Sequence, residues 1–216
     1  MLTIKQFTVN PLEENCYIVS DETLEAAIID PGCFAQSEWA PILDYIQRAR
    51  LTPTCCLLTH AHFDHIMGCH LVWRDLGLRP QLHIDDAPLY RNLQDQLTPF
   101  FGPGLRAPEQ PPLQHCFTGE DTITLGSHTL SLIHTPGHSR GSICLYCRQE
   151  DIILTGDTLF RGSMGRTDLD GGNTAQMSAS LRRLATLPPS VRVLPGHGPQ
   201  TTIQNEQTWI QPTCNR

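Results

Sequence analysis

The feature that most constrains this chain is the stretch T-H-A-H-F-D-H at residues 59–65, which places four possible metal ligands directly after a short apolar run. Side chains alternate in direction along an extended segment, so His60 and His62 would point the same way. Asp64 and His65 would follow in the next turn, where a helical pattern begins. Imidazole nitrogen and carboxylate oxygen suit zinc and other divalent first-row metals. Four such ligands at the end of a buried strand favour a metal site over a solvated histidine-rich loop.

Three later segments share one pattern, a polar ligand in a glycine-containing turn just past an apolar strand. They are T-P-G-H ending at His138, L-T-G-D ending at Asp157 and L-P-G-H ending at His197. Glycine permits the tight turn and the close backbone approach that a metal site needs. Each turn is a weak signal alone. Together with residues 59–65 they supply five histidines and two aspartates, the number that two adjacent four-coordinate ions need if one carboxylate bridges them.

Length and composition favour a single soluble domain over residues 1–216, because no Gly- or Ser-rich linker divides the chain. A chain of this size buries about 70% of its unfolded surface. The net charge is −7 and no basic run exceeds Arg182-Arg183, so nucleic acid is not an expected partner. The N-terminus lacks a signal-peptide pattern, and no apolar stretch approaches the roughly 18 residues of a membrane span. We therefore expect a cytoplasmic protein that binds no membrane.

The cysteine pattern does not indicate a disulfide framework. Nine cysteines are scattered along the chain, an odd number without regular spacing. In a chain without an export signal they are expected to be reduced core residues. Cys144 and Cys147 form a C-x-x-C, but within a predicted strand they would face opposite sides and could not share a metal.

The remaining elements indicate two halves, each with strands followed by a helix. The first half is expected to be an antiparallel meander of strands 2–9, 16–20 and 25–30, followed by a helix from Ser37, its N-cap, to Arg48. The second half is expected to contain strands 122–125, 129–134, 143–146 and 152–155, a helix at 173–185, a strand at 191–194 and a final helix opened by a Thr201/Gln204 capping box. This order favours α/β layers over an all-β sandwich.

Two features allow alternative interpretations. Asp30 lies in the turn Asp30-Pro31-Gly32 and is interpreted as a turn carboxylate, with an approach to the metal cleft from behind as the alternative. Residues 97–112 contain five prolines and two glycines, so no regular element is expected there. Long irregular loops are usually functional or disordered, and we interpret this one as a flap over a pocket rather than a connector.

The motifs together resemble the metallo-β-lactamase superfamily of hydrolases. The segments G-D-T-L-F at 156–160 and G-R-T-D at 165–168 are closest to its glyoxalase II-like branch. The resemblance implies a four-layer αβ/βα sandwich with two divalent ions at the sheet edges, zinc being expected and iron or manganese being alternatives. By this resemblance the first ion is held by His60, His62 and His138, the second by Asp64, His65 and His197, and Asp157 bridges them. The other histidines are interpreted as surface or packing residues: His70, His83, His115, His128 and His134.

The resemblance also implies a function, hydrolysis of an acyl-glutathione thioester by a metal-bound hydroxide, with Asp64 and Asp157 as catalytic residues. Only 19 residues follow His197, so the chain would be a short form without the C-terminal helical domain of full-length glyoxalase II. Arginine side chains could bind a substrate carboxylate bidentately, or could form ion pairs with Asp168 or Asp170 instead. The candidates are Arg140, Arg161 and Arg166.

Other functions on the same fold remain as alternatives. They are a persulfide dioxygenase with a single iron and a lactonase. A non-catalytic module braced by metal is disfavoured, because structural zinc sites are usually cysteine-rich and no cysteine lies in the ligand turns. Nucleic-acid processing is disfavoured by the acidic charge, and β-lactamase activity by the lack of an export signal.

Overall fold

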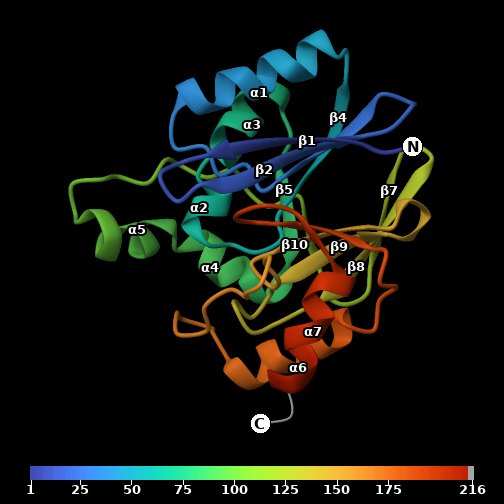
Figure 1. The fold of residues 1–216 in the computed structure, drawn as a ribbon. Helices are drawn as coiled ribbons and strands as arrows, with labels where there is room; N and C mark the ends of the chain where they lie inside the picture. The colour runs from blue at the N-terminus through green and yellow to red at the C-terminus, as the bar shows by residue number, and fades with distance from the viewer. Residues whose placement is uncertain (214–216) are drawn as a thin grey trace.

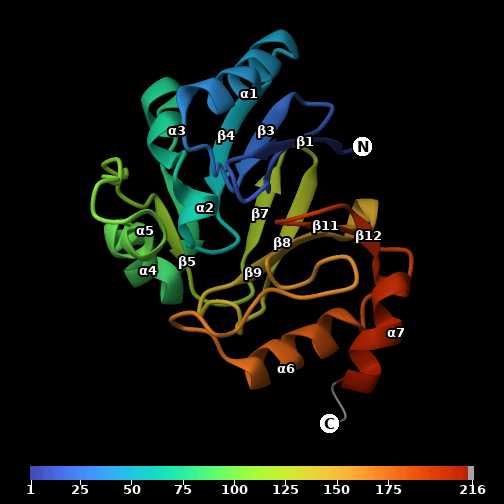
Figure 2. The same ribbon diagram turned by 60° about the vertical axis from the view of Figure 1, so that its left-hand side comes forward.

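The computed structural model describes the backbone of residues 1–213 and the side chains through Ile210. Its strands form two six-stranded sheets, with orders β1-β2-β3-β4-β5-β6 and β12-β11-β10-β9-β8-β7. Helices α1 and α3 cover the outer face of the first sheet, and α6 and α7 that of the second (Figures 1 and 2). This four-layer arrangement confirms the predicted αβ/βα fold class. None of the described helices has the length and apolar character needed to cross a membrane.

The first sheet begins as the predicted antiparallel meander and continues with parallel strands. Its strands are β1 (Thr3–Val9), β2 (Glu14–Ser20), β3 (Glu25–Ile29), β4 (Thr52–Leu57), β5 (Pro80–His83) and β6 (His115–Phe117). The helical segments beside it are α1 (Gln36–Arg48), α2 (Phe63–Ile66), α3 (Cys69–Leu76), the 3-10 turn η1 (Ile84–Asp86), α4 (Ala87–Arg91) and α5 (Leu93–Phe101).

The second sheet is antiparallel except where β10 pairs with β11, with α6 between them in the chain. Its strands are β7 (Thr122–Leu125), β8 (His128–His134), β9 (Ile143–Cys147), β10 (Ile152–Gly156), β11 (Arg192–Pro195) and β12 (Thr201–Thr202). The 3-10 turn η2 (Arg148–Glu150) precedes β10, and the helices are α6 (Thr174–Leu184) and α7 (Ile203–Thr213).

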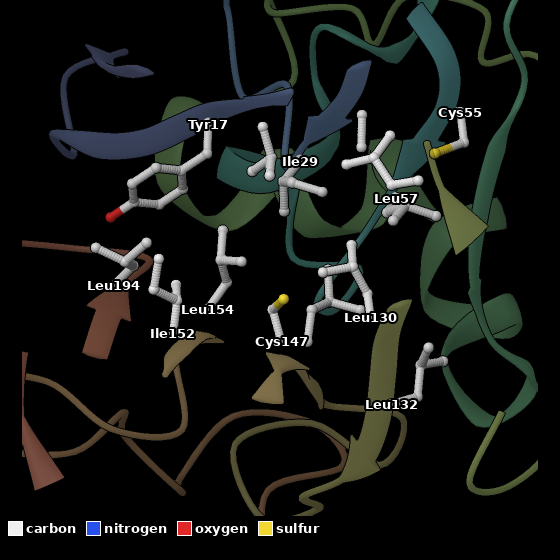
Figure 3. Packing of buried hydrophobic residues seen from close by; sticks show 14 of the residues in the cluster. Tyr17, Ile29, Cys55, Leu57, Leu130, Leu132, Cys147, Ile152, Leu154 and Leu194 are labelled. Carbon is white, nitrogen blue, oxygen red and sulfur yellow. The ribbon is translucent and has the colours of Figure 1, made fainter. Parts of the chain in front are cut away.

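Apolar side chains from the facing sides of both sheets form one core, in which Ile29 and Leu57 lie opposite Leu130 and Leu154 (Figure 3). Cys147 belongs to this core, whereas Cys144 packs on the other face of β9 with the α6 residues. The C-x-x-C pair therefore faces opposite sides, as predicted. All eight cysteines among the described side chains are free.

Two predictions about helix N-termini were wrong. The N-cap of α1 is Ala35 rather than Ser37, and the carboxylate of Glu38 accepts the Phe34 N–H at 2.7 Å instead. The final helix is opened by Thr202, whose hydroxyl accepts the N–H of Asn205, while the Thr201 hydroxyl donates to Glu206 rather than pairing with residue 204.

The segment predicted to be irregular is helical in its first part. α5 extends to Phe101 with Pro99 inside it, and it ends at Gly102, whose φ is 73°. Pro99 cannot donate the helical hydrogen bond that the carbonyl of Asp95 would otherwise accept, and the helix ends soon after it. Within the predicted segment 97–112, the part without helix or strand is residues 102–112.

His128 forms an ion cluster with two carboxylates, and the two carboxylates come from separate turns. Its Nδ1 lies 3.2 Å from Asp21 Oδ2 and its Nε2 lies 2.9 Å from Glu150 Oε1. Asp21 also accepts the Ser127 N–H at 2.7 Å. Burial favours the neutral ring, but the hydrogen bonds to Glu150 and Asp21 outweigh it and raise the pKa of His128.

A raised pKa in the folded state gives stability that is complete below the unfolded value, about 6.5, and is lost as pH rises through the folded value. We therefore expect His128→Gln to lower the unfolding free energy by up to about 1 kcal/mol near pH 6, and by less near pH 9. Urea unfolding of both proteins at the two pH values measures this. An equal loss at both values would contradict a charged His128.

Candidate metal centre

The seven predicted ligands converge on one edge of the two sheets. Each follows the end of a strand or lies in the short helix beside it: His60 after β4, His62, Asp64 and His65 at and within α2, His138 after β8, Asp157 after β10 and His197 after β11. Six of them are buried, and His197 is partly exposed. Segments separated by more than 130 residues thus meet in one place.

Three histidines form the first group of ligands. His62 Nδ1 lies 2.7 Å from His138 Nε2, and the ring of His60 lies 4.8 Å from the ring of each. Two imidazole nitrogens at such a distance repel each other unless a proton or a cation lies between them. Burial lowers the pKa of His62 to about 3, with His138 adding to the effect, so a proton is disfavoured there.

The second group combines a carboxylate with two histidines. His197 Nε2 lies 3.2 Å from Asp64 Oδ2, and His65 Nε2 lies 3.8 Å from the same oxygen. Asp157 lies between the two groups: its Oδ1 is 3.3 Å from His65 Nε2, and its Oδ2 is 3.4 Å from His138 Nε2. The two oxygens of Asp157 therefore face both groups.

The donor set fits divalent metal ions. Among the described side chains, His60 Nε2, His65 Nε2 and Asp157 Oδ1 are buried without a hydrogen-bond partner. Buried polar atoms are almost always satisfied in native proteins, so these three point to an ion. The pKa of His60 is well below its usual value, because burial and the neighbouring His65 disfavour the charged ring. A neutral imidazole is the form that binds a metal.

The second nitrogen of four of these rings is held by the surrounding protein. His60 Nδ1 contacts the Thr59 hydroxyl at 3.1 Å, and His65 Nδ1 lies 3.1 Å from Asp30 Oδ2. His138 Nδ1 donates to the carbonyl of Arg166, and His197 Nδ1 to that of Leu12. Such contacts fix the tautomer and orientation of metal-binding histidines.

The interpretation of Asp30 as a turn carboxylate was wrong. Asp30 is only 1% exposed, and its carboxylate accepts the Thr59 N–H at 2.7 Å and the Thr59 hydroxyl at 2.6 Å as well as contacting His65. It therefore approaches the centre from behind, which was the alternative. Asp86 and Glu14 are two further buried carboxyl groups near the centre that were not predicted. Asp86 lies just past a strand end like the predicted ligands, and that position is the signal that could have identified it.

A cleft of about 710 Å³ opens onto the ligands. Apolar side chains form much of its wall, including Leu12, Phe63, Leu89, Pro99, Phe100 and Phe160. The predicted flap contributes only through Pro99 and Phe100 of α5, since residues 102–112 do not line this cleft.

The three candidate arginines differ in position. Arg140 and Arg166 line the cleft, whereas Arg161 does not. Arg166 donates two hydrogen bonds to Asp168, at 2.6 and 2.7 Å, as the ion-pair alternative required. Arg140 Nη2 lies 3.9 Å from Asp170 and is the less constrained of the two.

The five other histidines lie outside the two groups. The rings of His83 and His134 stack at 4.1 Å, and His115 packs edge-on against Phe117. His70 Nδ1 contacts the Met67 carbonyl, while His128 belongs to the ion cluster described above.

Comparison with known proteins identifies the family. The profile described as "Metallo-beta-lactamase superfamily" matches residues 9–197. The chain belongs to the metallo-β-lactamase superfamily. Among superfamily relatives, the chain is 36% identical to "Probable metallo-hydrolase YqgX" of Bacillus subtilis, over 94% of this chain and 93% of that protein. It is 29% identical to "Hydroxyacylglutathione hydrolase GloC" of Haemophilus influenzae, over 95% of each chain.

Solved structures of this superfamily share the architecture. BLEG-1, described as a B3 metallo-beta-lactamase, superposes with a TM-score of 0.86 and 35% identity, covering 95% of this chain and 97% of that one. TTHA1623, solved in a di-iron-bound form, superposes with a TM-score of 0.81 and 38% identity, covering 94% and 96%.

Proposed function

We propose that this protein is a metal-dependent hydrolase that cleaves the thioester of an acylated small thiol of the glutathione type. The observation that carries the proposal is the seven-ligand centre, which lies at the base of an open cleft. Structural metal sites are closed, whereas catalytic sites keep a position open to substrate. The likeness to GloC supports the thioester class, and the likeness to YqgX supports a metallo-hydrolase.

The ligand set supports two ions, with zinc as the proposed metal. His60, His62 and His138 would hold one ion, Asp64, His65 and His197 the other, and Asp157 both. Imidazole and carboxylate ligands also suit iron and manganese. Iron is the main alternative to zinc, because the similar protein TTHA1623 was solved in a di-iron-bound form.

The bound ions would supply an activated water and polarise the substrate carbonyl. The protein contributes orientation: Asp64 and Asp157 face the cleft and are assigned to align the attacking water and accept its hydrogen bonds. The apolar wall formed by Phe63, Phe100 and Phe160 would seat the acyl chain and exclude bulk water.

The leaving group decides the substrate class. Water adds to the acyl carbon and releases a proton to solvent, the C–S bond breaks, and the sulfur keeps the electron pair. A thiol has a pKa of about 8.5, so it can leave as thiolate without a proton donor. Arg140 at the cleft rim would meet a carboxylate of the thiol carrier. An amide nitrogen would require a donor, which disfavours a β-lactam despite the likeness to BLEG-1.

A substrate panel tests the proposal. Purified protein with measured metal content is incubated with an acyl-glutathione, a lactone and a cephalosporin, and oxygen uptake is followed with glutathione persulfide. We expect the acyl-glutathione to have the largest kcat/KM. Persulfide-dependent oxygen consumption by protein with one iron per chain, without thioester cleavage, would replace the proposal with the dioxygenase alternative.

Phe100 is expected to contribute to substrate binding, because it lines the cleft and its ring lies 5.0 Å from that of Phe63. Phe100→Ala should raise KM for an apolar acyl thioester about tenfold, the effect of losing roughly 1.5 kcal/mol of apolar contact. Phe101→Ala is the matched control, since Phe101 is exposed on the same helix but does not line the cleft. Equal KM changes in both variants would show that the acyl chain does not contact Phe100.

A further inference from the structure

Asp86 is a buried carboxylate at the end of η1, only 1% exposed, and it belongs to neither group of proposed ligands. Its Oδ2 accepts the Ala61 N–H at 3.0 Å and the Ser139 hydroxyl at 2.7 Å. Its Oδ1 accepts the Gly141 N–H at 2.6 Å. Both oxygens therefore accept hydrogen bonds, from two segments that are about 80 residues apart in the chain.

These two segments carry the whole first group of ligands. Ala61 lies between His60 and His62, and Ser139 directly follows His138. The Asp86 carboxylate holds the N–H groups of Ala61 and Gly141 at hydrogen-bond distance. It therefore sets the spacing between the loop after β4 and the turn after β8. The nearest nitrogen pair across these segments, in His62 and His138, is the 2.7 Å contact described above.

The local sequence fits this contact closely. A Cβ on Gly141 would lie 2.7 Å from the Asp86 nitrogen and 2.8 Å from its Cβ and Cγ. Such distances are shorter than real contacts of a Cβ, so only glycine lets the turn approach the carboxylate this closely. Asparagine at residue 86 would turn an NH2 group toward at least one donor, losing a hydrogen bond and adding repulsion.

We propose that Asp86 is a positioning residue that sets the separation of His60 and His62 from His138 and thereby the affinity of the first metal position. The proposal rests on the two-ion centre proposed above and deepens it. Asp86 acts through the backbone of the ligand segments. Removing an outer partner of this kind typically weakens metal binding on the order of 10- to 100-fold.

Asp21 provides a matched control. It is also a buried carboxylate, 5% exposed, that accepts backbone N–H groups from two separate segments, at Thr23 and Ser127. Neither partner is adjacent to a metal ligand in the sequence. Asp21→Asn therefore makes the same chemical change in a similar setting and should lower stability without changing metal affinity.

The experiment is a zinc titration of the metal-free protein against a chromophoric chelator. Wild-type protein should bind two ions. Asp86→Asn should bind one ion normally and the other on the order of 10- to 100-fold more weakly, while Asp21→Asn binds both as wild type does. The loss should persist in the His197→Ala background, which weakens the second position and leaves the first to be measured. Faster hydrogen exchange of the Ala61 and Gly141 amides in metal-free Asp86→Asn should accompany it.

Ser139→Ala is the milder variant if Asp86→Asn does not fold, because it removes one of the three donors and keeps both backbone contacts. It should weaken one ion several-fold. Wild-type affinity for both ions in a folded Asp86→Asn protein, or an equal loss in Asp21→Asn, would overturn the proposal. A wild type that binds two ions but cleaves no thioester would overturn the proposed substrate and leave the role of Asp86 intact.

Discussion

Asp157→Ala is expected to lower kcat/KM for thioester hydrolysis by about 10³-fold or more, equivalent to roughly 4 kcal/mol of transition-state stabilisation. Asp157 is the residue whose two oxygens face both ligand groups, at 3.3 Å from His65 Nε2 and 3.4 Å from His138 Nε2. Its removal takes one proposed ligand from each ion. Bound zinc should fall from two ions per chain to one or fewer, measured by metal analysis after dialysis.

The control for this prediction lies at the other end of the same strand. Asp151 directly precedes β10 and accepts a hydrogen bond from the Ser190 hydroxyl at 3.0 Å. Asp151→Asn removes the same charge and keeps a residue that tolerates its positive φ of 52°. It should retain both ions and most of the activity. An Asp157→Ala enzyme with two ions and near-normal kcat/KM would exclude Asp157 as the bridging ligand.

Gly196→Ala is expected to reduce activity nearly as strongly without removing a single ligand. A Cβ at residue 196 would lie 2.4 Å from Asp157 Oδ1 and 2.8 Å from His65 Cε1. Both side chains are buried and cannot move far, so the added methyl group would displace His65 of the second group and the carboxylate of Asp157 beside it. We expect a loss of about 10²-fold in kcat/KM, since misplacement by about 1 Å costs this much.

A glycine in open surroundings separates this effect from a general effect of glycine replacement. A Cβ at Gly104 would meet no atom within 4 Å, and its φ is not positive. Gly104→Ala should therefore keep wild-type activity and metal content. If Gly196→Ala retained both zinc affinity and kcat/KM, the second group would not have the geometry described above.

The sequence could predict that these seven side chains meet, because each lies past a strand end, in a glycine-containing turn or in the T-H-A-H-F-D-H stretch. His138 and His197 both follow Pro-Gly, and Asp157 follows Thr-Gly in the same kind of turn after an apolar strand. Strand ends at one sheet edge lie close together whatever their separation in the chain, so local patterns sufficed for the centre. The superfamily resemblance supplied the pairing into two groups.

The sequence could not predict the outer contacts, because their partners are distant in the chain. Asp30 reaches Thr59 and His65, and Asp86 reaches Ala61, Ser139 and Gly141, through pairings that only the fold creates. The start of α1 was predicted wrongly for a related reason. The carboxylate of Glu38 accepts the N–H groups of Phe34 and of the distant Asn10, and Ser37 does not cap the helix.

We infer that the seven side chains hold two ions side by side. Crystals of zinc-loaded protein, measured on both sides of the zinc absorption edge, test it directly. We expect two anomalous peaks, one among His60, His62 and His138 and one among Asp64, His65 and His197, with Asp157 contacting both. A single peak at full occupancy, or zinc bound away from these residues, would contradict it.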